Sequence, residues 1–346
     1  MRYQSFDQRL GRARTAAIRL NWTEIELGRS YEGRPICGFT NAQDAKRIMA
    51  WSLMHGNEPT GFEALMDLMS SSTLASSYFI IPILNPDGAE AFTRLNAQGM
   101  DINRDARALI SPEAQALVAA FRSFKPELVL NLHDQRPRFF PKGSNKPAAF
   151  SLLAPKGHPE APNEAQQSAQ DLAQRVLAKW IGQLLPKWPG AVARFDDQFY
   201  PTAFGEYFQE HGVATITFET GIHLSDWSRA PVGKQLSALL IDLDRLPSWT
   251  DLDPNIQAYH DLPMNDYPAN EWLIHHSNGT THLRLEERVI EGQFVIQWVV
   301  EAYDPTMPSW IQSHCEQSLS HLLPGTVVSQ DQIQSFGISE DFGLNN

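Results

Sequence analysis

The sequence has few cysteines and no long apolar run. Its 346 residues include only two cysteines, Cys37 and Cys315, too few for a disulfide framework or a cysteine-rich zinc site. We expect two buried thiols in a reducing compartment. No run of about eighteen apolar residues occurs, and the N-terminus lacks the apolar core of a signal peptide. We therefore expect a cytoplasmic protein without a membrane span.

Positive charge is scarce as well. The chain has 28 Lys and Arg residues against 40 Asp and Glu residues, which gives a net charge of −12, and it has no long basic run. An acidic surface repels phosphate backbones, so we expect no nucleic-acid partner. Apolar residues make up 42% of the chain and charged residues 20%, as in globular rather than disordered proteins.

Four short apolar runs are typical of buried strands. They comprise residues 47–54, 78–84, 127–132 and 213–218. Runs this short and rich in β-branched residues favour central strands covered on both faces. Helical spacing occurs at residues 60–69, 112–124, 163–185 and 232–246. Ser111 and Pro112 suit the N-cap and first position of the second of these helices. The alternation predicts an α/β fold with a largely buried sheet.

The pattern changes near residue 247. The segment LPSWTDLDP is rich in Pro, Asp and Ser, which is typical of a linker. Beyond it, residues 282–288 and 293–300 alternate polar and apolar side chains, with Glu291 and Gly292 between them. This pattern predicts a hairpin with one solvated face. We therefore expect a large domain over residues 1–247 and a small α+β domain over residues 248–346.

Polar groups follow each of the four apolar runs. They are HGNE, NPDG, NLHD and ETG, in chain order. In open α/β sheets, ligands bind outside the carboxyl ends of the strands, so four such ends could meet at one site.

Three residues in these groups offer a metal-ligand set. The imidazoles of His55 and His133 with the carboxylate of Glu58 would leave one zinc position for water, whose pKa zinc lowers to about 7. Glu219 is the candidate base for the proton of that water. Each residue also has an ordinary interpretation: HxxE patterns are common, His133 could be a hydrogen-bonded structural residue, and Glu219 could be a capping or ion-paired carboxylate. Their occurrence together at strand ends favours the metal site.

Five motifs carry a family resemblance. HGNEPTG, NPDG, TRLNAQGMDINRD, LNLHD and TITFETG resemble, in this order, the motifs of the zinc carboxypeptidase family in its compact bacterial form. The resemblance extends over about residues 15–244. It implies a mixed, twisted sheet sandwiched by helices. It also implies one Zn²⁺ per chain, held by His55, Glu58 and His133, with Glu219 as general base.

The same resemblance assigns substrate-binding residues. Arg94 matches the arginine that polarises the scissile carbonyl, and Asn103 and Arg104 match the pair that grips the terminal carboxylate of the substrate. A guanidinium fork suits a carboxylate because it donates two parallel hydrogen bonds. The alternative for either arginine is a surface ion pair. Tyr200 is the nearest counterpart of the mobile tyrosine of the family, with Tyr207 second.

The resemblance implies a zinc metallocarboxypeptidase or amidohydrolase. Such an enzyme cleaves an amide next to a free carboxylate, in a peptide, a muropeptide or an acyl amino acid. An N-acyl amino acid deacylase of the aspartoacylase kind shares the metal site and the Asn–Arg clamp and stays an alternative. A non-catalytic carboxylate-binding protein is a third interpretation, disfavoured because the ligands and the base are all present. Specificity among these depends on pocket shape and loops.

Overall fold

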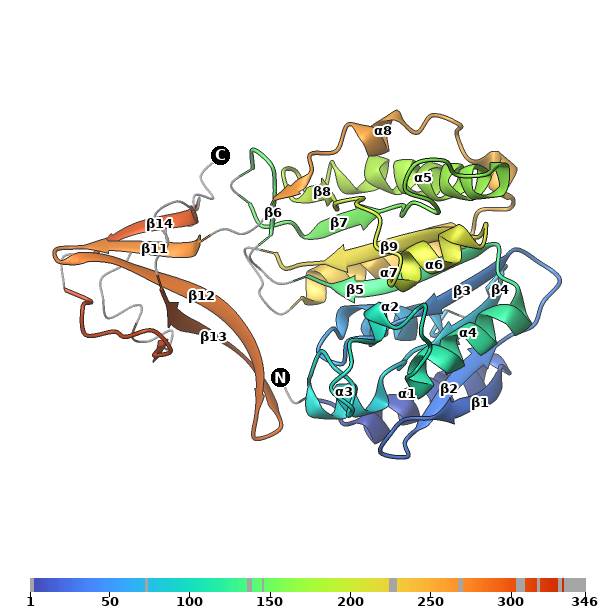
Figure 1. Ribbon diagram of the computed structural model, residues 1–346, viewed down its shortest axis with the longest axis horizontal. Coiled ribbons are helices and arrows are strands. Elements are labelled where there is room, and N and C mark those ends of the chain that lie inside the picture. Colours follow the sequence, from blue (N-terminus) through green and yellow to red (C-terminus); the bar gives the residue numbers. More distant parts are fainter. Residues whose placement is uncertain are drawn as a thin grey trace.

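An eight-stranded mixed sheet forms the centre of the larger part of the molecule (Figure 1). The computed structural model describes residues 3–71, 74–135, 139–144, 146–223, 229–266, 270–302, 309–315, 318–328 and 332. The strand order is β1-β2-β4-β3-β5-β9-β7-β8. These strands are β1 (Thr23–Arg29), β2 (Pro35–Thr40), β3 (Arg47–Trp51), β4 (Ser77–Ile81), β5 (Leu128–Asp134), β7 (Phe150–Leu153), β8 (Val192–Arg194) and β9 (Ala214–Thr220).

The four predicted strands are confirmed as β3, β4, β5 and β9. The pairs β4–β3, β3–β5 and β5–β9 are parallel, whereas β1–β2, β2–β4 and β9–β7 are antiparallel. Every residue of β4 and β5 is buried, because helices cover both faces of the sheet. Since β3, β5 and β9 run in the same direction, their carboxyl ends reach the same edge of the sheet.

Alternate residues of the central strands divide between two cores. In β3, Ile48 and Ala50 join one core, and Met49 and Trp51 join the other. The first core is covered by helices α1 (Phe6–Leu20), α2 (Thr60–Leu68), α5 (Glu164–Leu184) and α7 (Ala230–Asp244). The second is covered by α4 (Pro112–Phe124) and α6 (Phe204–Glu210). Two short helices, α3 (Pro86–Ala91) and the 3₁₀ helix η1 (Ile102–Arg104), follow β4.

Local sequence signals set the helix starts. Ser111 caps α4 by accepting a hydrogen bond from the backbone nitrogen of Ala114, and Pro112 takes the first helical position, as predicted. The four predicted helices are confirmed as α2, α4, α5 and α7. No helix in the described part of the chain combines the length and the apolar character that crossing a bilayer requires. Cys37 and Cys315 are both buried, in agreement with the expectation for the two thiols.

The chain after α7 first packs back against the larger unit. A 3₁₀ turn η2 (Trp249–Asp251) and helix α8 (Gln257–His260) precede strand β10 (Asn265–Asp266), which pairs with β6 (Phe140–Pro141). Tyr259 and Leu262 belong to the first core. By packing, the chain through residue 266 therefore lies with the larger unit, and the boundary expected at residue 247 stays a prediction.

A second, five-stranded sheet begins at Asn270. Its order is β14-β11-β12-β13-β15. Its strands are β11 (Asn270–His276), β12 (Gly279–Ile290), β13 (Gln293–Glu301), β14 (Ser309–Cys315) and β15 (Val327–Val328). The predicted hairpin is confirmed as β12 and β13. It turns through Glu291 and Gly292, both in the left-handed region with φ values of 49° and 71°.

Arg229 joins the two sheets beside the carboxyl end of β9. Its buried guanidinium pairs with Glu287 of β12, and the Nη2–Oε2 distance is 3.1 Å. It also donates hydrogen bonds to the backbone oxygens of Thr220, Gly221 and Gln135. A buried arginine needs such partners to offset its desolvation. The second sheet is thus attached next to the strand end that carries Glu219.

Candidate metal centre and substrate cavity

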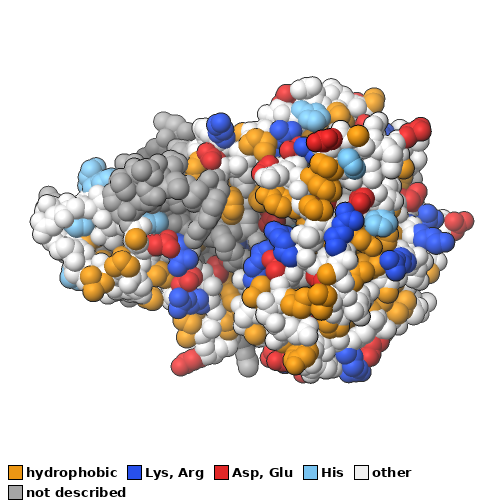
Figure 2. All heavy atoms as spheres, viewed as in Figure 1, with side chains coloured by type: hydrophobic (Ala, Val, Ile, Leu, Met, Phe, Trp, Pro, Cys, Tyr) orange, Lys and Arg blue, Asp and Glu red, His pale blue; other side chains and the backbone are white. Residues whose placement is uncertain are grey.

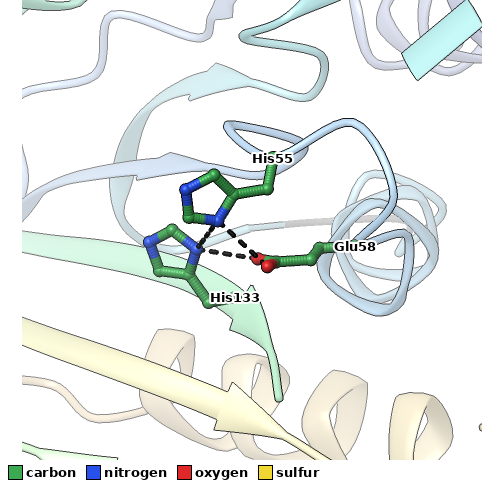
Figure 3. A group of neighbouring side chains, drawn as sticks. All are labelled: His55, Glu58 and His133. Carbon is green, nitrogen blue, oxygen red and sulfur yellow. Dashed lines mark hydrogen bonds and ion pairs between the residues drawn. The ribbon is translucent and has the colours of Figure 1, made fainter. Parts of the chain in front are cut away.

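His55, Glu58 and His133 point toward one another at the edge of the sheet (Figure 3). His55 lies in the loop after β3, Glu58 lies just before α2, and His133 belongs to β5. Nδ1 of His55 is 3.0 Å from Oε1 of Glu58, and Nδ1 of His133 is 2.8 Å from Oε2 of Glu58. The two Nδ1 atoms are 3.1 Å apart. The structure therefore brings the three predicted ligands together, although they come from three separate elements.

This donor set fits a divalent cation. One ligand atom from each residue lies within 4.8 Å of the others, and all three side chains are buried. In the Nδ1–Nδ1 contact at most one nitrogen can carry a hydrogen, so the other presents a lone pair. Nε2 of His133 is buried and has no hydrogen-bond partner among the described residues. Two imidazoles and one carboxylate form the ligand set typical of a metal site that keeps a position open for water.

The charges of the three groups are strongly coupled. Burial favours neutral His55, but the carboxylates of Glu58 and Asp101 outweigh it and raise the pKa of His55 to about 9. Burial lowers the pKa of His133. Despite its own burial, Glu58 has a pKa well below its usual value because both imidazoles stabilise its carboxylate. An ionised carboxylate thus faces two imidazoles in a dry site, and such a site suits a cation.

Two further acidic residues hold the ligands in place, Asp101 through its carboxylate and Asp134 through its backbone nitrogen. Oδ1 of Asp101 is 2.9 Å from Nε2 of His55, a contact that fixes the ring with Nδ1 toward Glu58. The backbone nitrogen of Asp134 donates to Oε2 of Glu58 over 3.2 Å. Its side chain in turn accepts hydrogen bonds from the nitrogen and hydroxyl of Thr60 at the start of α2. Asp101 was not predicted as a site residue. Its only sequence signal was its position two residues before Asn103.

A cavity of about 370 Å³ opens beside the ligands. The five predicted catalytic and substrate-binding residues all line it: Arg94, Asn103, Arg104, Tyr200 and Glu219. Tyr207, the second candidate for the mobile tyrosine, is instead buried in the second core and packs against aromatic residues of its own helix. The geometry therefore favours Tyr200, which is 43% exposed.

The two arginines have different surroundings. Arg94 is ion-paired: its Nη2 is 2.9 Å from Oδ2 of Asp101, and its Nη1 is 3.4 Å from Oε1 of Glu58. Arg104 is exposed and lies over the ring of Tyr200 at 5.8 Å. It has no carboxylate within ion-pair distance among the residues that the structure describes. Arg104 is thus the cation available to a ligand, whereas Arg94 is held beside the metal ligands.

Asn103 presents one half of its amide to the cavity. Its Oδ1 accepts a hydrogen bond from the backbone nitrogen of Phe204 over 3.0 Å, which ties η1 to the start of α6. The amide NH₂ group is therefore the part that a ligand could use. This is the donor that a carboxylate requires.

Glu219 lies opposite His133 in the register of β5 and β9. Side chains on one face of a strand recur every second residue, so Asn131 and His133 face the same side as their partners Thr217 and Glu219. Burial, and then the negative charge of Glu58, raise the pKa of Glu219. A cation bound by His55, Glu58 and His133 would oppose this rise.

Two more acidic residues line the cavity, the exposed Asp196 and the buried Glu206. Glu206, in α6, is only 6% exposed. The sequence carried no signal for it, because α6 has no strong apolar period and was not predicted. Elsewhere the charges are mixed: Figure 2 shows Lys and Arg side chains scattered among Asp, Glu and apolar side chains on this face.

The fold is similar to solved metallo-carboxypeptidases. One is the enzyme from Burkholderia cenocepacia, with a TM-score of 0.54 and 16% identity over 69% of this chain and 68% of that chain. Another is the enzyme from Pseudomonas aeruginosa in complex with (2-guanidinoethylmercapto)succinic acid, with a TM-score of 0.50 and 18% identity over 69% and 68% of the two chains. No family model and no curated protein matches the sequence. The predicted zinc carboxypeptidase-like fold is confirmed.

Proposed function

We propose that this protein is a zinc-dependent hydrolase that cleaves an amide next to a free carboxylate, in the manner of a metallocarboxypeptidase. One observation carries the proposal. The ligand atoms of His55, Glu58 and His133 converge beside a cavity that also contains Glu219 and the unpaired cation of Arg104. A catalytic metal, a base and a carboxylate anchor are the parts that this reaction needs.

The metal would be held by His55, Glu58 and His133. A bound zinc ion would lower the pKa of water to about 7 and polarise the scissile carbonyl. Glu219 accepts the proton of the attacking water at its carboxylate and passes it to the leaving nitrogen.

Arg104 and Asn103 would bind the terminal carboxylate of the substrate. A charged hydrogen bond of this kind contributes roughly 1.5–3 kcal/mol, and the contact also places the scissile bond over the metal. Arg94, held between Asp101 and Glu58, lies where it could donate to the carbonyl oxygen as negative charge develops on it. The Pseudomonas aeruginosa enzyme binds a succinic acid derivative, and this too supports a carboxylate-bearing substrate.

The experiment is a comparison of matched substrates with zinc-loaded protein. We expect hydrolysis of N-acyl dipeptides with a free terminal carboxylate and far slower hydrolysis of the same peptides with an amidated end. Chelation should abolish turnover, and added zinc should restore it. Equal rates on both substrate types would contradict the carboxylate clamp, and full activity after chelation would contradict the metal mechanism.

A further inference from the structure

A second cavity, of about 400 Å³, lies between residues 3–12, the starts of α2 and α7, and the tip of the β12–β13 hairpin. Its lining shares no residue with that of the substrate cavity. Tyr3 and Phe294 form its aromatic part, and their ring centroids lie 5.3 and 5.8 Å from that of Phe92. The backbone nitrogen of Tyr3 also donates to the oxygen of Gly292 in the hairpin turn. The cavity is thus built where the hairpin meets the larger unit, and the proposed hydrolysis does not use it.

Arg9 brings a buried positive charge to this cavity without a carboxylate partner. Its side chain is 3% exposed, and it forms no ion pair with any residue that the structure describes. Its Nη1 donates to the backbone oxygens of Gln4 and Ala89, whereas its Nε is buried and has no acceptor among the described residues. Burying a guanidinium is unfavourable unless an anion accompanies it. An anion bound in the cavity would therefore offset the burial of Arg9.

Two other arginines of the lining already have carboxylate partners. Nη2 of Arg12 is 2.8 Å from Oε2 of Glu63, and the pair makes two parallel hydrogen bonds. Arg229 is paired with Glu287 of β12. Neither guanidinium is therefore available to a ligand.

A lysine in the first turns of α7 provides the second available cation. Lys234 lines the cavity, is exposed and has no carboxylate within ion-pair distance in the described part of the chain. Asp67 is the remaining charged residue of the lining, and its carboxylate accepts a hydrogen bond from the hydroxyl of Ser237 over 2.9 Å. The lining thus has two cations without a carboxylate partner, Arg9 and Lys234, against one carboxylate without a cationic partner. This excess of positive charge favours an anionic ligand.

Two helices begin at the same cavity. Thr60 of α2 and Gly233 of α7 line it, and neither N-cap residue, Pro59 or Arg229, makes a side-chain capping hydrogen bond. The nitrogen of Thr60 is already bonded to Asp134, but the positive ends of both helix dipoles still lie at the cavity. Gly233 leaves space beside them, because an added Cβ would lie 3.6 Å from Cγ2 of Thr60, an ordinary contact. Helix starts of this kind favour bound anions and add to the effect of the two cations.

We propose that this cavity binds a small organic anion, a carboxylate or phosphate group on an apolar body. Its charged group would pair with Arg9 and Lys234, and its body would lie against Tyr3 and Phe294. The volume lies within the range of small-molecule sites, roughly 300–1,000 Å³. The site is separate from the substrate cavity, and the inference does not rest on the proposed hydrolase function. Because such a ligand contacts α2, α7 and the hairpin together, its binding should raise the Tm of the protein.

The test is calorimetry and thermal unfolding of the zinc-loaded protein with phenyl phosphate, benzoate and the neutral benzamide. We expect the wild type to bind at least one of the two anions, with a rise in Tm, and not to bind benzamide; the tighter anion identifies the charged group. Lys234→Gln should weaken this binding by on the order of 10-fold, and Arg9→Gln by at least as much. Lys187→Gln is the matched control, because Lys187 is exposed and lines neither cavity. It should leave the affinity unchanged.

Arg104→Ala locates the bound anion, because Arg104 lines the substrate cavity alone. Full binding in Arg104→Ala, with weakened binding in Lys234→Gln, supports the site. The reverse result would place the anion in the substrate cavity and overturn the inference. Equal binding of benzamide and the anions, or no binding of either anion to wild type, would also overturn it. If circular dichroism shows that Arg9→Gln does not fold, Lys234→Gln decides, because the exposed Lys234 is not needed for packing.

Discussion

Replacing Gly56 with alanine should force apart two loops that hold the metal site. Gly56 lies between His55 and Glu58, and its Cα faces the backbone at the start of α3. A Cβ added there would lie 1.8 Å from the carbonyl carbon of Gly88, 2.1 Å from its oxygen and 2.2 Å from the nitrogen of Ala89. All three atoms are backbone, so no side chain can turn aside. The glycines of the HGNE and NPDG motifs are thus packed against each other.

The loss of stability in Gly56→Ala follows from these short distances. Overpacking a buried site costs about 1–3 kcal/mol, and we expect the upper end because the contact must open by more than an ångström. For a domain of 150–250 residues, each kcal/mol lowers Tm by about 2–4 °C, so we expect a fall of about 6–12 °C. The displaced loop also carries His55 and Glu58, so zinc affinity should fall as well.

Thermal unfolding and metal analysis on Gly56→Ala measure the two effects. Gly182→Ala is the control: Gly182 is in α5, and an added Cβ there meets nothing within 4 Å. Because alanine favours a helix over glycine by about 0.5–1 kcal/mol, this variant should be slightly more stable and keep its zinc. A Gly56→Ala protein with wild-type Tm and full zinc content would refute the close approach of the two loops.

Three further outcomes are expected. Glu219→Gln should keep its zinc and lose turnover by on the order of 10²–10⁴-fold, and near-normal kcat would remove Glu219 from the mechanism. Arg104→Ala should reduce kcat/KM by about 10- to 100-fold on free-acid substrates but much less on amidated ones; equal losses would indicate a structural role. Asp101→Asn should weaken zinc binding by about 10–100-fold in chelator competition, because the amide orients His55 less well.

The elements that the sequence determined are those with strong local signals. The central strands were predictable because burial on both faces requires continuous apolar runs, and α4 was predictable from Ser111 and Pro112. The hairpin followed from alternation around Glu291 and Gly292. Edge strands were not predicted: β1 is mostly exposed and β8 has three residues, so neither needs an apolar run. Helix α6, with seven residues, is also too short for a clear period.

The candidate site likewise combines residues that local motifs identify with contacts that only the tertiary structure creates. The three metal ligands, Glu219 and the Asn–Arg pair could be named from motifs, because each motif is a short continuous piece of chain. His55 and Asp101 are 46 residues apart in the sequence, and Gly56 and Gly88 are 32 residues apart. Glu206 lines the same cavity as His55 and Arg94, which lie still farther from it in the sequence. Only the tertiary structure decides such contacts, because the sheet order and the packing of α6 on β9 bring these segments together, and no local pattern encodes the distance between residues remote in sequence.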